Sequence, residues 1–186
     1  MSGSIAFVGD GLTAGGRWDE WFPTYSVHNL GISADTTDEV IARTDDVVDL
    51  QPDAVVLMIG TNDLGWRRSD EYVVRNIETF LVTIRKRLPH ARILVQSVLP
   101  RESDYAKTIG SINRHLRQFA PTQHALYLDL WPALAAPDGG IAPEYSDDRL
   151  HVNDAGYALW VVELGPALAA LFARSPTTTA IPIQHA

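Results

Sequence analysis

Cysteine is absent from the 186 residues, which excludes disulfide bonds, thiolate metal ligands and a cysteine nucleophile. Basic residues are also few: 15 Lys and Arg stand against 23 Asp and Glu, which gives a net charge of −8. This balance argues against a nucleic-acid partner, which needs a clustered basic face. No apolar run reaches the length of a bilayer-spanning helix, and the first residues lack the charged-then-apolar pattern of a secretory signal. We therefore expect a cytoplasmic protein with no membrane span, unless a leader has been removed.

The length fits one domain, which we place at residues 1–174. Residues 175–186 contain a threonine run and two prolines, so we expect a loosely ordered tail there. Within the domain, short apolar runs alternate with longer amphipathic segments. The expected strands are Ile5–Val8, Ser26–Asn29, Ala54–Ile59, Arg92–Val98 and Ala125–Leu130. The expected helices are Thr37–Leu50, Ser69–Leu88, Tyr105–Phe119 and Asn153–Ala173.

This alternation of strands and helices predicts a mainly parallel five-stranded sheet inside a three-layer α/β/α sandwich of the flavodoxin-like type. Ligands of such sheets bind beyond the carboxyl ends of the strands. Three of those ends are rich in small and polar residues: Gly9–Thr13, Asn29–Gly31 and Gly60–Asp63. The sequence therefore predicts a binding site at this edge of the sheet.

A fourth polar element, Asp148-Arg149-Leu150-His151, stands just before the last expected helix. An Asp three residues before a His can accept the imidazole Nδ1–H and leave Nε2 free to act as a base. Alone, this pattern more often means a helix cap beside a surface histidine, and Asn153 is a suitable cap residue. Together with the three strand ends, it indicates a catalytic base.

These blocks, in this order and spacing, resemble those of SGNH (GDSL-type) serine esterases. The runs 29–37, 98–101 and 151–157 are most similar to the platelet-activating-factor acetylhydrolase-like branch. The resemblance covers about residues 5–172 and implies an esterase without a cofactor. It makes residue 11 the nucleophile position and one oxyanion donor, Gly31 and Asn62 the other donors, His151 the general base and Asp148 its orienting partner. For substrate contacts we single out Asp10, Trp66 and Arg101.

The serine that the resemblance requires is replaced by glycine at position 11. Glycine has no atom that can attack a carbonyl, so we expect the chain to bind its ester and barely turn it over. Thr13 lies two residues after position 11 and Ser33 two residues after Gly31, and we expect both hydroxyls to make turn or cap hydrogen bonds. The other blocks are intact, which favours an engineered Ser→Gly replacement over natural loss.

Other interpretations remain open or are set aside. A pseudo-enzyme that binds an acylated or carbohydrate ligand, and an acyltransferase, are the alternatives to a hydrolase of small acyl esters. The spacing Gly9-x-Gly11-x-x-Ala14 imitates a dinucleotide fingerprint, but the second strand ends at Asn29 instead of an acidic residue. A metal site is not expected, because no histidine outside the Asp148–His151 block has a carboxylate at ligand spacing. Families of this type often self-associate, so a homo-oligomer is compatible with the resemblance.

Overall fold

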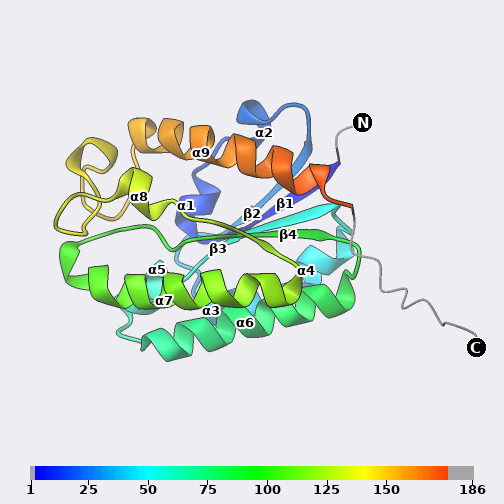
Figure 1. The fold of residues 1–186 in the computed structure, drawn as a ribbon, viewed down its shortest axis with the longest axis horizontal. Helices are drawn as coiled ribbons and strands as arrows, with labels where there is room; N and C mark the ends of the chain where they lie inside the picture. Colours follow the sequence, from blue (N-terminus) through cyan, green and yellow to red (C-terminus); the bar gives the residue numbers. More distant parts are fainter. Residues whose placement is uncertain (1–2, 176–186) are drawn as a thin grey trace, which may run out of the picture.

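Five parallel strands form one sheet in the order β2-β1-β3-β4-β5. The structure is a computed structural model that describes residues 3–175, so the expected tail lies, apart from Ser175, outside the described residues. Helices cover both faces of the sheet and give three layers (Figure 1). This arrangement confirms the predicted fold class. The strands are β1 (Ser4–Gly9), β2 (Ser26–Gly31), β3 (Ala54–Met58), β4 (Arg92–Gln96) and β5 (Leu126–Leu128).

The central strands are apolar throughout because both of their faces are covered. Successive side chains of a strand point to opposite faces of the sheet. In β1, Ile5 and Phe7 join one hydrophobic core, and Ala6 and Val8 join the other. All of β3 is buried in the same way. The continuous apolar runs in the sequence are therefore the signature of a sheet that lies between two helical layers.

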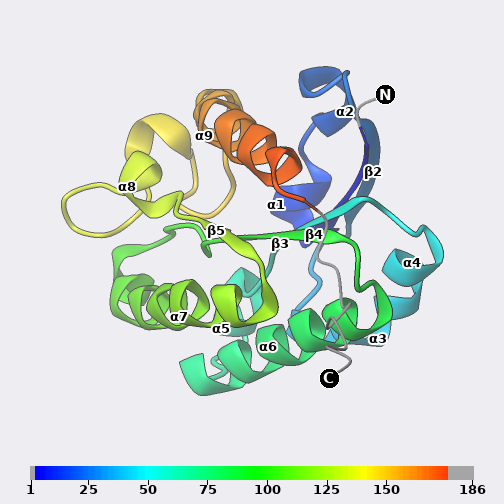
Figure 2. The same ribbon diagram turned by 45° about the vertical axis from the view of Figure 1, so that its right-hand side comes forward.

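The two helical layers are unequal. Helices α3 to α7 pack on one face, and α1, α2, α8 and α9 pack on the other (Figure 2). The helices are α1 (Gly11–Ala14), α2 (Trp18–Trp21), α3 (Thr37–Ala42), α4 (Thr44–Asp49), α5 (Thr61–Gly65), α6 (Asp70–Arg87), α7 (Ala106–Phe119), α8 (Trp131–Leu134) and α9 (Asp154–Ala173).

The helix predicted at Thr37–Leu50 is broken into α3 and α4. Arg43 separates them with a non-helical backbone, φ −104° and ψ 24°. Its guanidinium donates to the Gly9 carbonyl (3.0 Å) and to an oxygen of Asp35 (2.7 Å). The break therefore accompanies contacts between Arg43 and the loops at the sheet edge, which no local pattern reveals.

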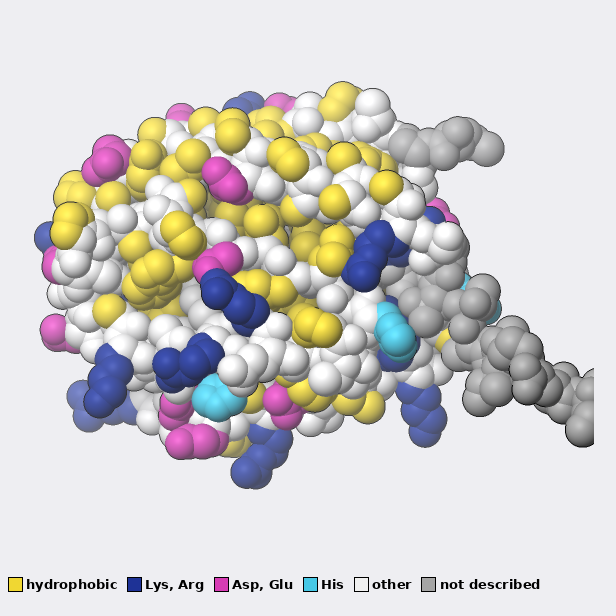
Figure 3. Space-filling view, viewed as in Figure 1, with side chains coloured by type: hydrophobic (Ala, Val, Ile, Leu, Met, Phe, Trp, Pro, Cys, Tyr) yellow, Lys and Arg dark blue, Asp and Glu magenta, His cyan; other side chains and the backbone are white. Residues whose placement is uncertain are grey.

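Helix α9 is capped as predicted: the Asn153 side chain accepts from the Gly156 N–H at 3.1 Å. By length and composition α9 could cross a membrane, with a mean hydropathy of 1.5, although we expect no such segment from the sequence. Trp160, Leu164 and Leu168 are buried against the sheet, and apolar side chains also gather on the outer surface over α9 (Figure 3). A core helix passes the same test of length and hydropathy, so this finding is weak support for a membrane span.

Strand register aligns the carboxyl ends of three neighbouring strands. Gly9 pairs with Gly31 on one side and with Met58 on the other. The loops that follow these residues therefore leave the sheet at the same level. Residues 10–13, 31–36 and 59–63 meet there.

Candidate active site

Gly11 begins the short helix α1 directly after β1. The Asp10 side chain caps that helix by accepting the Leu12 N–H at 2.9 Å. The backbone at Gly11 is not in the left-handed region, and a Cβ built there comes no closer than 3.4 Å to any neighbour, the Ser33 Oγ. That is ordinary van der Waals contact, so neither backbone conformation nor space requires glycine at position 11. By contrast, a Cβ on Gly9 would lie 2.2 Å from the Met58 carbonyl oxygen.

Gly31, the expected second oxyanion donor, is not among the residues that line the cavity beside Gly11. That N–H already donates to the Asn29 side-chain oxygen at 3.0 Å. A Cβ on Gly31 would lie 2.2 Å from the Ala14 nitrogen, so glycine is required here for the close approach of β2 to α1. The role of Gly31 is therefore in packing.

The turn after β2 supplies a different donor. Asp35 N–H donates to the Ile32 carbonyl (3.2 Å), which places Ser33 and Ala34 at the tip of a tight turn. Ala34 has a φ of 67°, a left-handed conformation that such turns usually assign to glycine. Among the described residues, its N–H has no hydrogen-bond partner, and Ala34 lines the cavity beside Gly11. Unlike the bonded Gly31 N–H, the Ala34 N–H is therefore available to a ligand in this cavity.

Asn62 lies in α5, after the end of β3, and one N–H of its side-chain amide is already hydrogen-bonded. Its Nδ2 donates to the Asp35 main-chain oxygen at 2.8 Å, which leaves the second N–H for a ligand. The adjacent Asp63 is fully buried and accepts from Thr37 N–H (2.9 Å), from the Thr37 hydroxyl (2.7 Å) and from Arg68 (3.0 Å). These contacts hold the Asn62 loop against the start of α3.

Asp148 and His151 form the predicted pair in the loop before α9. Asp148 Oδ2 accepts from His151 Nδ1 at 2.6 Å, and Oδ1 accepts from the main-chain N–H groups of Leu150 (2.9 Å) and His151 (2.7 Å). The hydrogen bonds from His151, ring first, hold the pKa of Asp148 well below its usual range. Since the ionised carboxylate can only accept, the neutral form of His151 carries its proton on Nδ1 and has Nε2 as its acceptor.

Residues from each of these four segments line one open cavity of about 260 Å³. Its walls include Gly11, Ser33, Ala34, Asn62 and His151. The structure thus brings together an oriented imidazole, the first N–H of α1, the Ala34 N–H and the Asn62 amide. Chemically, such a site can bind a carbonyl oxygen and accept a proton from a nearby hydroxyl.

The three residues singled out for substrate contact lie in different environments. Asp10 lines the cavity but is fully buried, and that burial raises its pKa to about 7, with the charges of Asp35 and Asp63 adding to the effect. Trp66 is 74% exposed and is not among the cavity-lining residues. Arg101 is buried, with its guanidinium bonded to Glu102 (2.6 Å) and to the Thr61 carbonyl (2.9 Å). Arg101 therefore holds the loop of Asn62 through the Thr61 carbonyl and does not line the cavity.

The side-chain hydroxyls of Thr13 and Ser33 do not make the hydrogen bonds expected of them. Thr13 Oγ1 is buried and has no hydrogen-bond partner. Ser33 is exposed, and within the described part of the chain its hydroxyl has no partner either. The prediction that both make turn or cap hydrogen bonds is wrong. No local pattern reveals this, because serine and threonine near turns usually bond to the backbone.

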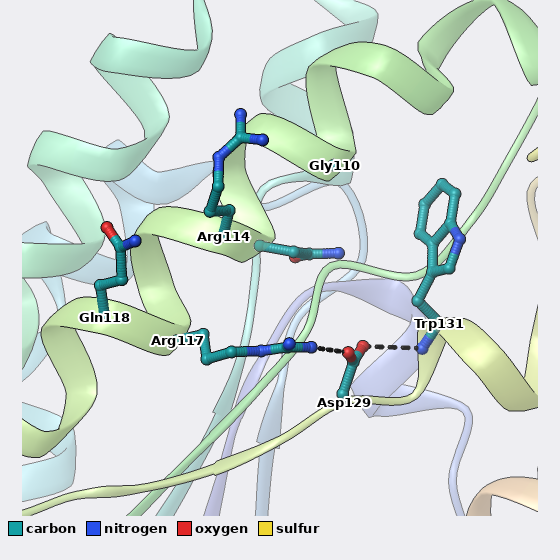
Figure 4. Close-up of a pocket in the computed structure, with 7 residues that line it drawn as sticks. Gly110, Arg114, Arg117, Gln118, Asp129 and Trp131 are labelled. Atoms are coloured by element: carbon teal, nitrogen blue, oxygen red, sulfur yellow. Dashed lines mark hydrogen bonds and ion pairs between the residues drawn. The ribbon is translucent and has the colours of Figure 1, made fainter.

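A larger cavity, of about 430 Å³, lies beside β5 and α7 (Figure 4). Two of its charged residues are engaged with each other: Arg117 pairs with Asp129, which also accepts from the Trp131 N–H at 3.2 Å. No histidine or hydroxyl lines it. Within residues 3–175, no group of three or more His, Asp or Glu side chains is placed to hold a metal ion. The smaller cavity beside Gly11 is therefore the candidate active site.

Comparison with known proteins decides the family. The profile of the GDSL-like lipase/acylhydrolase family matches residues 4–159. The chain belongs to the GDSL-like lipase/acylhydrolase family. Among curated members, it is 29% identical over 164 residues to the platelet-activating factor acetylhydrolase IB subunit alpha1 of Bos taurus, which covers 82% of this chain and 69% of the relative. The alpha2 subunit of Rattus norvegicus is also 29% identical, over 83% of this chain and 71% of the relative.

Solved structures of GDSL-like proteins share the fold. A GDSL-like lipase from Bacteroides thetaiotaomicron matches with a TM-score of 0.81 at 22% identity, covering 90% of this chain and 88% of that one. A catalytic mutant of an acetylxylan esterase from Geobacillus stearothermophilus matches with a TM-score of 0.73 at 20% identity, covering 89% and 94%. The three-layer fold is therefore that of GDSL-like hydrolases.

Proposed function

We propose that the cavity beside Gly11 binds a small acyl or acetyl ester, and that the site is built for Ser-His-Asp acyl-enzyme chemistry. The observation that supports this most is the pairing of Asp148 with His151 at 2.6 Å in the same cavity as two main-chain donors and the Asn62 amide. The relatives named as acetylhydrolase and acetylxylan esterase favour an acetyl ester as the substrate class. Among residues 3–175 the cavity is open, and its volume of about 260 Å³ suits a small ligand.

With a serine at position 11, each group would have a definite task. His151 Nε2 would take the proton of the hydroxyl, whose oxygen would attack the ester carbonyl. Asp148 would stabilise the resulting imidazolium. The N–H groups of Gly11 and Ala34 and the free Asn62 N–H would stabilise the oxyanion, which is usually the largest contribution to such catalysis. His151 would then protonate the leaving alcohol, and water would release the acyl group.

With glycine at position 11, turnover should fall on the order of 10⁶-fold below that of the serine form, with about 10³–10⁴-fold catalysis over water remaining. We propose that the glycine is an introduced replacement that would hold substrate or product in a working pocket. The intact Asp148–His151 pair and the room for a Cβ at position 11 support this origin. A natural pseudo-enzyme that binds an acylated or carbohydrate ligand is the alternative, and it is favoured by the missing hydroxyl itself. Acyl transfer to an alcohol would use the same groups.

The test is to restore the hydroxyl with Gly11→Ser and to measure hydrolysis of p-nitrophenyl acetate. We expect a gain of several orders of magnitude in kcat, lost again in Gly11→Ser/His151→Ala. A folded Gly11→Ser variant that binds acetylated sugars but hydrolyses no short-chain ester would favour the binding protein. Product analysis with added alcohols separates transfer from hydrolysis.

A further inference from the structure

Ser33 is the hydroxyl that lies next to the vacant nucleophile position. Its Oγ is 3.4 Å from a Cβ built on Gly11, and its Cα is 3.5 Å away. The hydroxyl of a serine at position 11 would lie one bond beyond that Cβ. Ser33 Oγ is therefore a direct neighbour of the place where the family nucleophile would act.

Three further features make this hydroxyl available. It is exposed, and it has no hydrogen-bond partner among residues 3–175. It lines the same cavity as His151, whose Nδ1 is held by Asp148 so that Nε2 is free to accept a proton. A nucleophilic serine needs a base of this kind in the same pocket, and the order of the two residues along the chain does not matter.

The local backbone also suits a nucleophile. Ser33 follows β2, precedes α3, and stands at the tip of a tight turn beside Ala34, whose φ is 67°. In α/β-hydrolases, the nucleophilic serine also lies in a strained turn between a strand and a helix, and the N–H of the next residue stabilises the oxyanion. Here that next residue is Ala34, whose N–H has no partner in the described structure.

We propose that Ser33 is the nucleophile of the protein as it stands, with His151 as its base, and that this route carries the residual ester hydrolysis. This inference rests on the proposed function. Ser33 Oγ forms a bond to the ester carbonyl carbon while its proton passes to His151 Nε2. The bond to the alcohol oxygen then breaks, and His151 returns the proton to that alcohol. Water attacks the acylated Ser33, gives one proton through His151 back to Ser33 Oγ, and releases the carboxylic acid.

A fluorophosphonate probe tests this directly, because it forms a stable bond with an activated serine hydroxyl. We expect the unmodified chain to gain one adduct, mapped by mass spectrometry to Ser33, and Ser33→Ala and His151→Ala to remove it. Ser26→Ala is the matched control, since Ser26 is exposed at the opposite end of β2. Residual hydrolysis of p-nitrophenyl acetate should fall at least about 100-fold in His151→Ala, and Ser33→Ala should fall to the same level.

The outcomes separate this inference from the proposed function. One set of results would overturn the inference: Gly11→Ser is active and labelled at the introduced hydroxyl, but the unmodified chain gains no adduct at Ser33. If Ser33→Ala also hydrolyses the ester at an unchanged rate, water attacks the ester carbonyl directly. If Gly11→Ser is also inert, the proposed function itself fails. Far-UV circular dichroism confirms that each variant is folded. Ser33→Cys gives a second check, because iodoacetamide should alkylate this thiol in a chain that has no cysteine of its own, and His151→Ala should slow that reaction.

Discussion

Arg43 and Asp35 form an ion pair, Nε to Oδ2 at 2.7 Å, in which both side chains are about nine-tenths buried. The same guanidinium donates to the Gly9 carbonyl, and the Asp35 main-chain oxygen receives the Asn62 amide. One arginine between two helices thus joins the loops after β1, β2 and β3. Replacing Arg43 should therefore lower the stability of the protein and change the geometry of the site.

Arg43→Met should lower the free energy of unfolding by about 3 kcal/mol, since it leaves a buried carboxylate without its partner. Urea unfolding monitored by circular dichroism measures this. Arg17→Met is the control: Arg17 pairs with Glu20 on the surface, where both side chains are at least 60% exposed, and such pairs contribute less than about 1 kcal/mol. Equal losses in the two variants would contradict the role given to Arg43.

Asp10 should make stability depend on pH. Its pKa is raised to about 7 by burial, above the ordinary 3.8 of the unfolded chain, so the folded state holds the extra proton between these values. The contribution of Asp10 to stability is therefore complete below about pH 4, declines as pH rises to 7, and stays low above that.

The variant Asp10→Asn keeps an acceptor for the Leu12 N–H and has no titrating group. Relative to the unmodified protein, it should gain a few kcal/mol in unfolding free energy between pH 4 and 8. Denaturant unfolding at one-unit pH intervals tests this. A difference that stays constant with pH would show that Asp10 is ionised in the folded protein throughout that range.

Ala34→Gly should stabilise the protein by about 1 kcal/mol, because the turn holds alanine at a φ of 67°, where L-residues are strained. Thermal unfolding would show the gain. The matched change Ala158→Gly, at an exposed position inside α9, should instead cost about 0.5–1 kcal/mol. Destabilisation by both would mean that the strain at residue 34 is relieved in solution.

Asp148→Asn should reduce kcat about 10⁴-fold when tested in the Gly11→Ser background, because an amide no longer selects the Nδ1–H tautomer of His151. Hydrolysis of p-nitrophenyl acetate is the measurement. Asp147→Asn changes the exposed neighbour, which accepts only a long hydrogen bond of 3.5 Å from Asn153, and its kcat should stay within a few-fold of that of its parent. A similar loss in both variants would point to general disturbance of the loop.

The fold could be predicted from the sequence because its signals are local. Apolar runs such as Ala54–Met58 mark strands covered on both faces, and Asn153 marks the start of α9. The pairing of Asp148 with His151 was also predictable, since only three positions separate them and one turn joins them. The break at Arg43 was not, because it accompanies contacts with Gly9 and Asp35 that exist only in the folded chain.

The proposed oxyanion donors show most clearly what the sequence alone cannot predict. Gly31 and Ala34 lie in the same loop, and spacing does not reveal which N–H faces the cavity. The Asn29 side chain binds the Gly31 N–H, whereas the left-handed turn leaves the Ala34 N–H unbound. Ser33 was missed for the same reason, since its closeness to position 11 is a contact between neighbouring strand ends.

His151 has 70% of its side chain exposed, and Asp148 has 53%. The imidazole is thus in contact with bulk water. The ester bond of an acylated serine beside it would be equally accessible to water. An added alcohol would have to compete with water at the full concentration of the liquid. A protein whose purpose was to pass its acyl group to a dilute acceptor would need to shield this histidine, so its exposure favours release of a free acid as the ordinary fate of the acyl group.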